Sequence, residues 1–207
     1  MVSLGVNHKN AYTGVMRLSD RYEVPPGAAL IYDFVNTLDD RRYIVDHVRL
    51  EGSDALATPA RFVEWLRQHD LHGTEDAGGW RDAVALRDAL RSYLKLPQIE
   101  RRAAAPALDA AASIYGLRVE ADGEGKVNLV PQAGVDNLAM VLVQLHSLSI
   151  TGQLDRLKAC ADPDCGWIFL DRSKPGSRRW CSSTGCGNRQ KTRAYRARQN
   201  QVDRPAI

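Results

Sequence analysis

The chain has 207 residues, of which 44% are hydrophobic and 26% charged, a composition typical of a globular protein with one large domain or two small ones. The first residues carry no apolar signal-peptide core, and no apolar run approaches the ~18 residues expected of a membrane-spanning helix. We therefore expect a soluble, cytoplasmic protein with no membrane association.

Charge is distributed unevenly along the chain. Residues 1–155 contain 16 Lys and Arg against 21 Asp and Glu, a net charge of −5, whereas residues 156–207 contain 12 against 4, a net charge of +8. A basic segment attached to an acidic domain often contacts a polyanion, most commonly nucleic acid. All four cysteines lie in the basic segment, and clustered thiols in a cytoplasmic protein are more often metal ligands than disulfides.

The first elements in chain order are an arm and two segments of a mostly helical domain. Residues 1–28 are polar and interrupted by prolines, so we expect a loose arm. Residues 29–39 fit either a short strand or the start of a buried helix, since periodicity does not separate the two. Residues 58–70 predict a helix with Thr58 as N-cap and Pro59 in its first turn. The apolar face of that helix contains Phe62, Val63 and Leu66.

Four further segments precede the cysteines. Residues 80–96 have the apolar spacing of a helix, and residues 99–116 are Ala-rich and helical, with Pro106 interrupting or restarting the helix. Residues 117–131 alternate around a Gly-containing turn and predict a β-hairpin. Residues 134–151 form the most apolar helix of the chain.

The four cysteines occur as two close pairs, with the spacing Cys160-x4-Cys165-x15-Cys181-x4-Cys186. Two pairs separated by a loop of this length suit a tetrahedral zinc site. Residues 166–171 have strand character and residues 178–181 would return as the second strand of a hairpin too small to fold without metal. Redox-active pairs are the alternative, but they usually have a two-residue spacer and a βαβ context. We predict one Zn²⁺ per chain, bound by all four thiolates.

Residues 187–200 predict a basic helix that begins near Asn188 as N-cap. Arg189, Arg193 and Arg196 share one face of it, and a second face contains Lys191, Tyr195 and Arg198. The helix has few apolar side chains and its like charges repel, so a phosphate backbone is its natural stabilising partner. A solvated basic face is the alternative.

Two more arginines, Arg178 and Arg179, precede Cys181 and are expected to offset part of the negative charge of a zinc-thiolate site. Arg189 or Lys191, at the helix start, is the expected reader of base edges. The predicted nucleic-acid contacts are Arg178, Arg179, Arg189, Lys191, Arg193, Tyr195, Arg196 and Arg198.

Residues 160–198, CADPDCGWIFLDRSKPGSRRWCSSTGCGNRQKTRAYRAR, resemble the CGNR zinc finger, named for the tetrapeptide found here at 186–189. Residues 29–41 (ALIYDFVNTLDDR) and 56–66 (LATPARFVEWL) are similar to the opening of the ABATE domain, which precedes the finger in that family. The resemblance implies a bacterial, stress-induced transcription regulator whose four cysteines bind zinc and whose finger binds DNA. It does not cover the arm before Ala29.

Together these observations predict an α+β protein with four segments. They are an arm (1–28), a mostly helical domain with one or two short hairpins (29–155), a small four-cysteine zinc finger with knuckle, hairpin and basic helix (156–200) and a tail (201–207). We expect the helical domain to have a core separate from the finger, so that a fragment ending near Lys158 folds alone. That domain would sense a small-molecule or protein effector or mediate assembly. An RNA-binding or protein-interaction module with an acidic partner is the alternative function.

Enzyme signals are weak, and we expect no catalytic activity. Asp33 and Asn36 lie among apolar residues, so they need buried hydrogen bonds or line a pocket, and we favour the structural role. His69 and His72 are expected at the surface at a helix end, and His146 in the core. The oligomeric state stays open.

Overall fold

The structure is a computed structural model that describes residues 17–45, 48–72, 76–132 and 138–202. The helices are α1 (Leu18–Arg21), α2 (Pro26–Val35), α3 (Pro59–Gln68), α4 (Ala77–Lys95), α5 (Ala105–Ala112), α6 (Ala139–Ile150) and α7 (Asn188–Val202), with 3-10 turns η1 (Gln98–Ala103) and η2 (Leu154–Arg156) and a π turn η3 (Ser183–Gly187). The strands form antiparallel pairs: β1 (Leu38–Asp39) with β4 (Ser53–Asp54), β2 (Ile44–Val45) with β3 (Val48–Arg49), β5 (Leu117–Ala121) with β6 (Val127–Pro131), and β7 (Leu157–Ala159) with β8 (Ile168–Leu170). This arrangement confirms the predicted α+β class.

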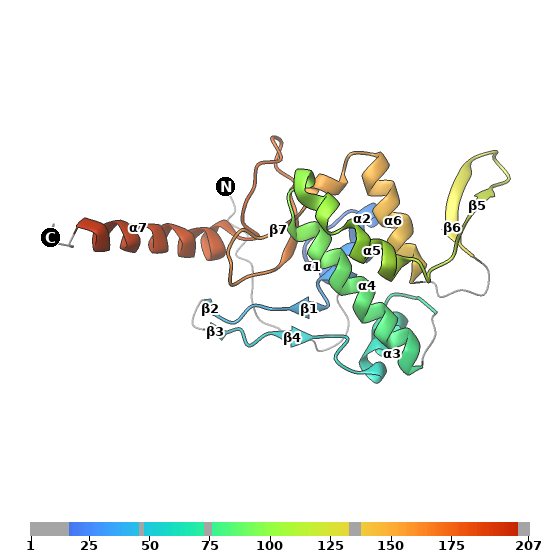
Figure 1. Ribbon diagram of the computed structural model, residues 1–207, viewed down its shortest axis with the longest axis horizontal. Coiled ribbons are helices and arrows are strands. Elements are labelled where there is room, and N and C mark those ends of the chain that lie inside the picture. The colour runs from blue at the N-terminus through green and yellow to red at the C-terminus, as the bar shows by residue number, and fades with distance from the viewer. Residues whose placement is uncertain (1–16, 46–47, 73–75, 133–137, 203–207) are drawn as a thin grey trace.

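Helix α2 lies at the centre of the core, between α4 and α6 (Figure 1). The segment that fitted a strand or a helix is therefore a helix. It begins at Pro26, a residue compatible with the first helical turn, and residues 31–35 are all buried, because neighbours pack on several sides of it. The tertiary surroundings decide a choice that the apolar run leaves open.

Helices α3 and α4 confirm the predicted helical segments, and α3 also confirms its predicted N-cap, whereas α4 begins at Ala77, before the predicted start. The Thr58 hydroxyl accepts a hydrogen bond from the Arg61 amide, and the Asp76 carboxylate accepts one from Gly79, so each helix has an N-cap. On α3, Phe62 and Leu66 are buried as predicted, but Trp65 is buried in place of Val63.

The arm expected at residues 1–28 is ordered from residue 17 onward, so the prediction of a loose arm is wrong for that part; residues 1–16 lie outside the described residues. Helix α1 docks on α2 because the backbone N–H and the hydroxyl of Ser19 both donate to the Asp33 carboxylate at 2.6 Å. His69 Nε2 lies 3.2 Å from the same carboxylate. Asp33 thus has the structural role that its apolar neighbours indicated. His69 is mostly buried, and His146 is exposed, which reverses the predictions for both.

The hairpin of the cysteine segment differs from the prediction. Strand β8 pairs with β7, which precedes the first cysteine, rather than with residues 178–181. Leu157 and Ile168 from this pair are fully buried in the same core as α2 and α4. Asn36 fixes the register by donating to the Ile168 carbonyl at 2.9 Å and accepting from its amide at 3.0 Å. Strands β7 and β8 thus extend the core of the helical domain, contrary to the expectation of a fully separate core, whereas the buried cysteines pack with Trp167 and Phe169 in a second cluster.

Two elements project from the body at opposite ends, the β5–β6 hairpin and helix α7 (Figure 1). Among the described residues no helix combines the length and the apolar character required to cross a bilayer. The four cysteines lie at the α7 end.

Candidate metal centre and basic helix

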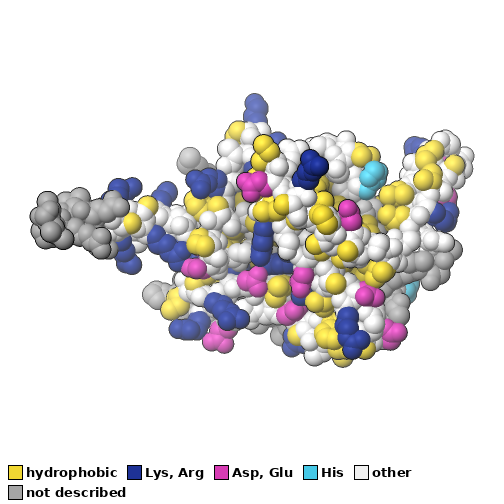
Figure 2. Space-filling view, in the orientation of Figure 1, with side chains coloured by type: hydrophobic (Ala, Val, Ile, Leu, Met, Phe, Trp, Pro, Cys, Tyr) yellow, Lys and Arg dark blue, Asp and Glu magenta, His cyan; other side chains and the backbone are white. Residues whose placement is uncertain are grey.

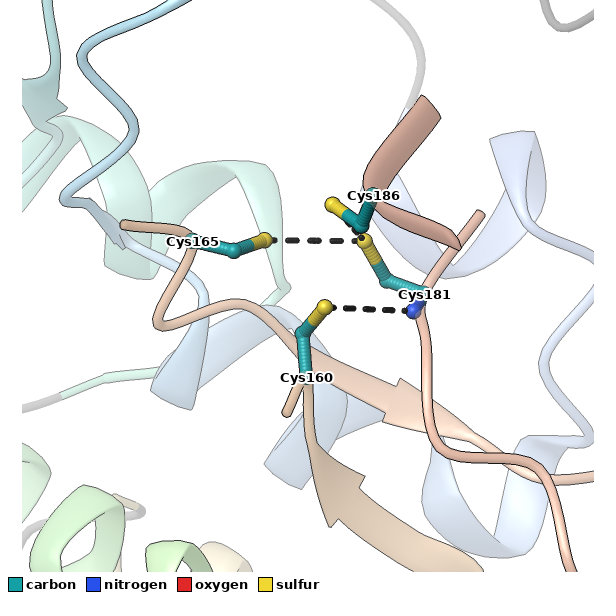
Figure 3. Close-up of side chains that lie close together, drawn as sticks. All are labelled: Cys160, Cys165, Cys181 and Cys186. Carbon is teal, nitrogen blue, oxygen red and sulfur yellow. Dashed lines mark hydrogen bonds between the residues drawn. The ribbon is translucent and has the colours of Figure 1, made fainter. Parts of the chain in front are cut away.

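The four cysteines converge on one point between β7, β8 and the start of α7 (Figure 3). Their sulfur atoms all lie within 4.8 Å of one another; Cys181 Sγ is 3.6 Å from Cys165 Sγ and 3.5 Å from Cys186 Sγ. A tetrahedral site with Zn–S bonds of ~2.3 Å requires sulfurs ~3.8 Å apart, whereas a disulfide requires ~2.05 Å. The four thiols are therefore positioned to bind one Zn²⁺.

Backbone hydrogen bonds shape the two knuckles that carry the thiols. The Cys160 amide donates to Trp167 O at 2.9 Å, and the Cys165 amide donates to Asp162 O at 2.9 Å. In the second knuckle the Ser182 hydroxyl accepts from the Gly185 amide at 3.0 Å and caps turn η3, which continues into α7. The predicted N-cap at Asn188 is wrong, because the helical path already begins five residues earlier, at Ser183.

Tyr43 brings the N-terminal part of the chain into the metal centre. Its hydroxyl lies 3.7 Å from Cys165 Sγ and 3.5 Å from Cys186 Sγ. Burial and the neighbouring sulfurs raise the pKa of Tyr43 well above its ordinary value, so the phenol keeps its proton and can donate to a thiolate. Sequence reasoning missed this residue, since nothing near position 43 marks it as a partner of a site more than 120 residues away.

Asp162, between the first two cysteines, anchors the start of α7. Its side chain is fully buried and accepts from Arg189 Nε at 3.0 Å and from Gln190 Nε2 at 3.0 Å. The Arg189 guanidinium also lies 3.2 Å from the centroid of the Tyr43 ring and donates to Cys186 Sγ at 3.4 Å. Asp162 and Asp164, two acids inside the first cysteine pair of a basic segment, were the signal that could have identified this anchor.

The two arginines before Cys181 do not contact the thiolates. Arg178 donates to the Trp180 carbonyl at 2.7 Å and lies over the Phe169 ring, while Arg179 lies over Trp180. Within the described residues the guanidinium that reaches a sulfur is that of Arg189. Arg189, predicted as a DNA contact, thus offsets thiolate charge in the place of Arg178 and Arg179.

The two predicted faces of α7 have different surroundings. Arg193 points to the same side as Arg189 and pairs with Asp162 and Asp164. Lys191, Tyr195 and Arg198 lie roughly opposite, at ~100° per residue, and are exposed, as is Arg196. Lys191, Arg196 and Arg198 have no ion pair among the described residues, and α7 contains no acidic residue (Figure 2).

Two family models match the chain. The model described as "CGNR zinc finger" matches residues 156–199, and the ABATE model, described as "Putative stress-induced transcription regulator", matches residues 28–148. These matches confirm the resemblance seen in the sequence and agree with the four converging sulfurs. A search of curated proteins finds no match to the chain.

Proposed function

We propose that this chain, which belongs to the ABATE family and carries a CGNR zinc finger, is a transcription regulator that binds DNA through the exposed cations of α7. One observation carries the proposal: α7 leaves the body as a helix without an acid of its own, and its Lys191, Arg196 and Arg198 are exposed and unpaired within the part of the chain that the structure describes (Figure 2). A helix of this kind gains free energy when phosphates replace the counterions around its cations.

The metal centre would hold α7 at a defined angle. Zn²⁺ bound by four thiolates supplies the rigid support for the knuckles that precede the helix. Asp162 then holds Arg189, and Asp164 holds Arg193, so the acids neutralise one side of the first two turns. The net positive charge of α7 is left on the opposite side and at its far end.

The dimensions of α7 suit the major groove. Its 15 residues extend about 22 Å, and an α-helix with side chains fits the ~12 Å width of that groove. Arg189 is engaged inside the protein, so Lys191 becomes the candidate reader of base edges near the helix start. Arg196 and Arg198 would contact phosphates, and Tyr195, 58% exposed, would pack on the sugar-phosphate backbone.

The N-terminal domain would sense a signal, such as a stress-related effector, or mediate assembly. Two residues of this domain contact the finger directly: Asn36 hydrogen-bonds to the Ile168 backbone, and the Tyr43 hydroxyl lies against the thiols. A conformational change in the domain can therefore be transmitted to α7. We further propose that the chain has a binding role in the cytoplasm rather than a catalytic one. RNA or an acidic protein is the alternative partner of the same helix.

The test is the salt dependence of binding to duplex DNA, measured by fluorescence anisotropy on the zinc-loaded chain. The double variant Arg196→Gln, Arg198→Gln should reduce the log–log salt slope by about 1.8, because each phosphate contact contributes ~0.9. The matched control, Arg67→Gln with Arg81→Gln, removes the same charge from the body and should leave the slope nearly unchanged.

An equal loss of slope in both double variants would show that net charge alone drives binding. An unchanged slope in the α7 variant would reject the helix as the DNA contact. Stronger binding to single-stranded or duplex RNA than to DNA would favour the alternative partner.

A further inference from the structure

The β5–β6 hairpin projects from the end of the body opposite α7 and, among the described residues, has no third strand (Figure 1). The pairs Leu117–Pro131, Val119–Leu129 and Ala121–Val127 place six apolar residues on one face of it. Val119 is 69% and Val127 70% exposed, and apolar side chains are visible on the hairpin in Figure 2. An isolated two-stranded hairpin is marginally stable in water, so this element is suited to receiving further strands.

The ladder of hydrogen bonds shows which backbone groups of β5 are free. Gly116 O accepts from the Gln132 amide at 2.9 Å, and the Asp122 amide donates to Lys126 O at 2.8 Å. Bonded and non-bonded pairs alternate in an antiparallel ladder, so the even-numbered residues of β5 direct their backbone groups toward β6. The N–H and C=O groups of Leu117, Val119 and Ala121 therefore point outward, and within the described residues they have no strand partner.

We propose that β5 pairs antiparallel with β5 of a second copy of this chain, across a two-fold axis at Val119. The result is a four-stranded sheet in the order β6-β5-β5-β6, with one continuous apolar face. Val119 then lies opposite the partner's Val119, and Leu117 opposite the partner's Ala121. These are the outward-pointing residues, so the pairing supplies about six backbone hydrogen bonds.

The charges of β5 are complementary to themselves in this register. Arg118 lies opposite the partner's Glu120, and Glu120 opposite the partner's Arg118. Both pairs occupy non-hydrogen-bonded positions, where opposing side chains are closest, and opposite charges there stabilise a sheet. In the single chain Arg118 forms an ion pair with Glu120 of its own strand. Dimerisation therefore replaces this ion pair with an equivalent one to the partner's Glu120.

Strand β6 lacks these properties. Its last residue, Pro131, has no N–H to donate, and pairing centred on Leu129 would place Asn128 opposite the partner's Val130, without charge complementarity. The self-complementary order of β5, LRVEA, is what identifies a second copy, rather than another protein, as the occupant. Since the pairing needs no DNA, its failure leaves the proposed function untouched.

Sedimentation velocity of the zinc-loaded full chain, without DNA, tests the pairing over a range of protein concentrations. Val119→Pro removes an outward N–H from the β5 edge, and its matched control, Val127→Pro, removes one from the β6 edge at a residue of nearly equal exposure. Wild type and Val127→Pro should be dimers, and Val119→Pro should dissociate at least about tenfold more readily.

Charge variants keep the test decisive if proline disturbs the hairpin. Arg118→Glu alone and Glu120→Arg alone should each be monomeric, because like charges then oppose one another across the axis. An equimolar mixture of the two variants should form a heterodimer, in which every opposed pair is again of opposite sign. A monomeric wild type, or a dimer that none of these variants weakens, would overturn the proposal.

Discussion

Replacing Asp162 with Asn tests whether the buried carboxylate between the first two cysteines holds α7 in place. Asp162 accepts hydrogen bonds from Arg189 and Gln190 and is fully buried. The variant keeps the shape of the side chain but removes its charge, and it exchanges one acceptor oxygen for a donor. Arg189 would then be left beside Tyr43 and Cys186 without its anion.

The size of the effect follows from the exposure of the two partners. Removing one partner of a buried ion pair costs about 3–5 kcal/mol, and removing one of an exposed pair costs about 0–1 kcal/mol. Arg189 is 21% exposed and Asp162 fully buried, so we expect the free energy of unfolding to fall by about 2–3 kcal/mol. In the matched variant Asp164→Asn, where Asp164 is 49% and Arg193 48% exposed, the loss should be below about 1 kcal/mol.

Urea unfolding followed by Trp fluorescence measures both losses on the zinc-loaded chain. Competition with a chelator should show a zinc affinity about 10–100-fold lower for Asp162→Asn, since Arg189 also contacts the Cys186 thiolate. Equal losses in the two variants, or none in Asp162→Asn, would refute the role of the carboxylate as the anchor of α7.

Two further predictions concern the contacts between the two parts of the chain, and a third concerns a buried carboxylate of the finger. Asn36→Ala leaves two buried backbone groups of Ile168 without hydrogen-bond partners. The free energy of unfolding, measured by chemical denaturation, should therefore fall by about 3–5 kcal/mol. A loss under about 1 kcal/mol would contradict this. Chelation of zinc should lower the unfolding temperature of the whole body in one transition, because Leu157 and Ile168 lie in the core that it shares with the helices. Two separated thermal transitions in circular dichroism would argue against this. Burial by itself raises the pKa of Asp171, but hydrogen bonds from Lys158 and from the residues around it lower the pKa below its usual value. The resulting stability is present above the unfolded-state pKa of about 3.9 and is lost as pH falls through the folded-state pKa. The free energy of unfolding of Asp171→Asn should therefore depend less on pH in the acid range than that of the wild type. Identical pH profiles of stability for the two proteins would count against this prediction.

The zinc centre and most helices could be predicted from local patterns in the sequence. Thr58 and Pro59 mark the start of α3, because capping depends on residues within one turn. The spacing of the four cysteines predicts a tetrahedral site, since each close pair forms one short knuckle and the loop between the pairs is long enough to bring the two knuckles together. The β5–β6 hairpin was predictable for the same reason, as its turn and alternation lie within 15 residues of chain.

The tertiary structure decided which partner each of these local elements has. Residues 29–35 could be assigned as helix only from the structure, in which α4 and α6 pack against α2. Strand β8 pairs with β7 because Leu157 and Ile168 are buried in the core of the N-terminal part. Arg189 and Lys191 are both cations at the start of the same helix, and only the position of Asp162 separates an anchored side chain from an exposed one. Contacts between residues far apart in the chain depend on burial and charge compensation in the folded state, and these have no signature in local spacing.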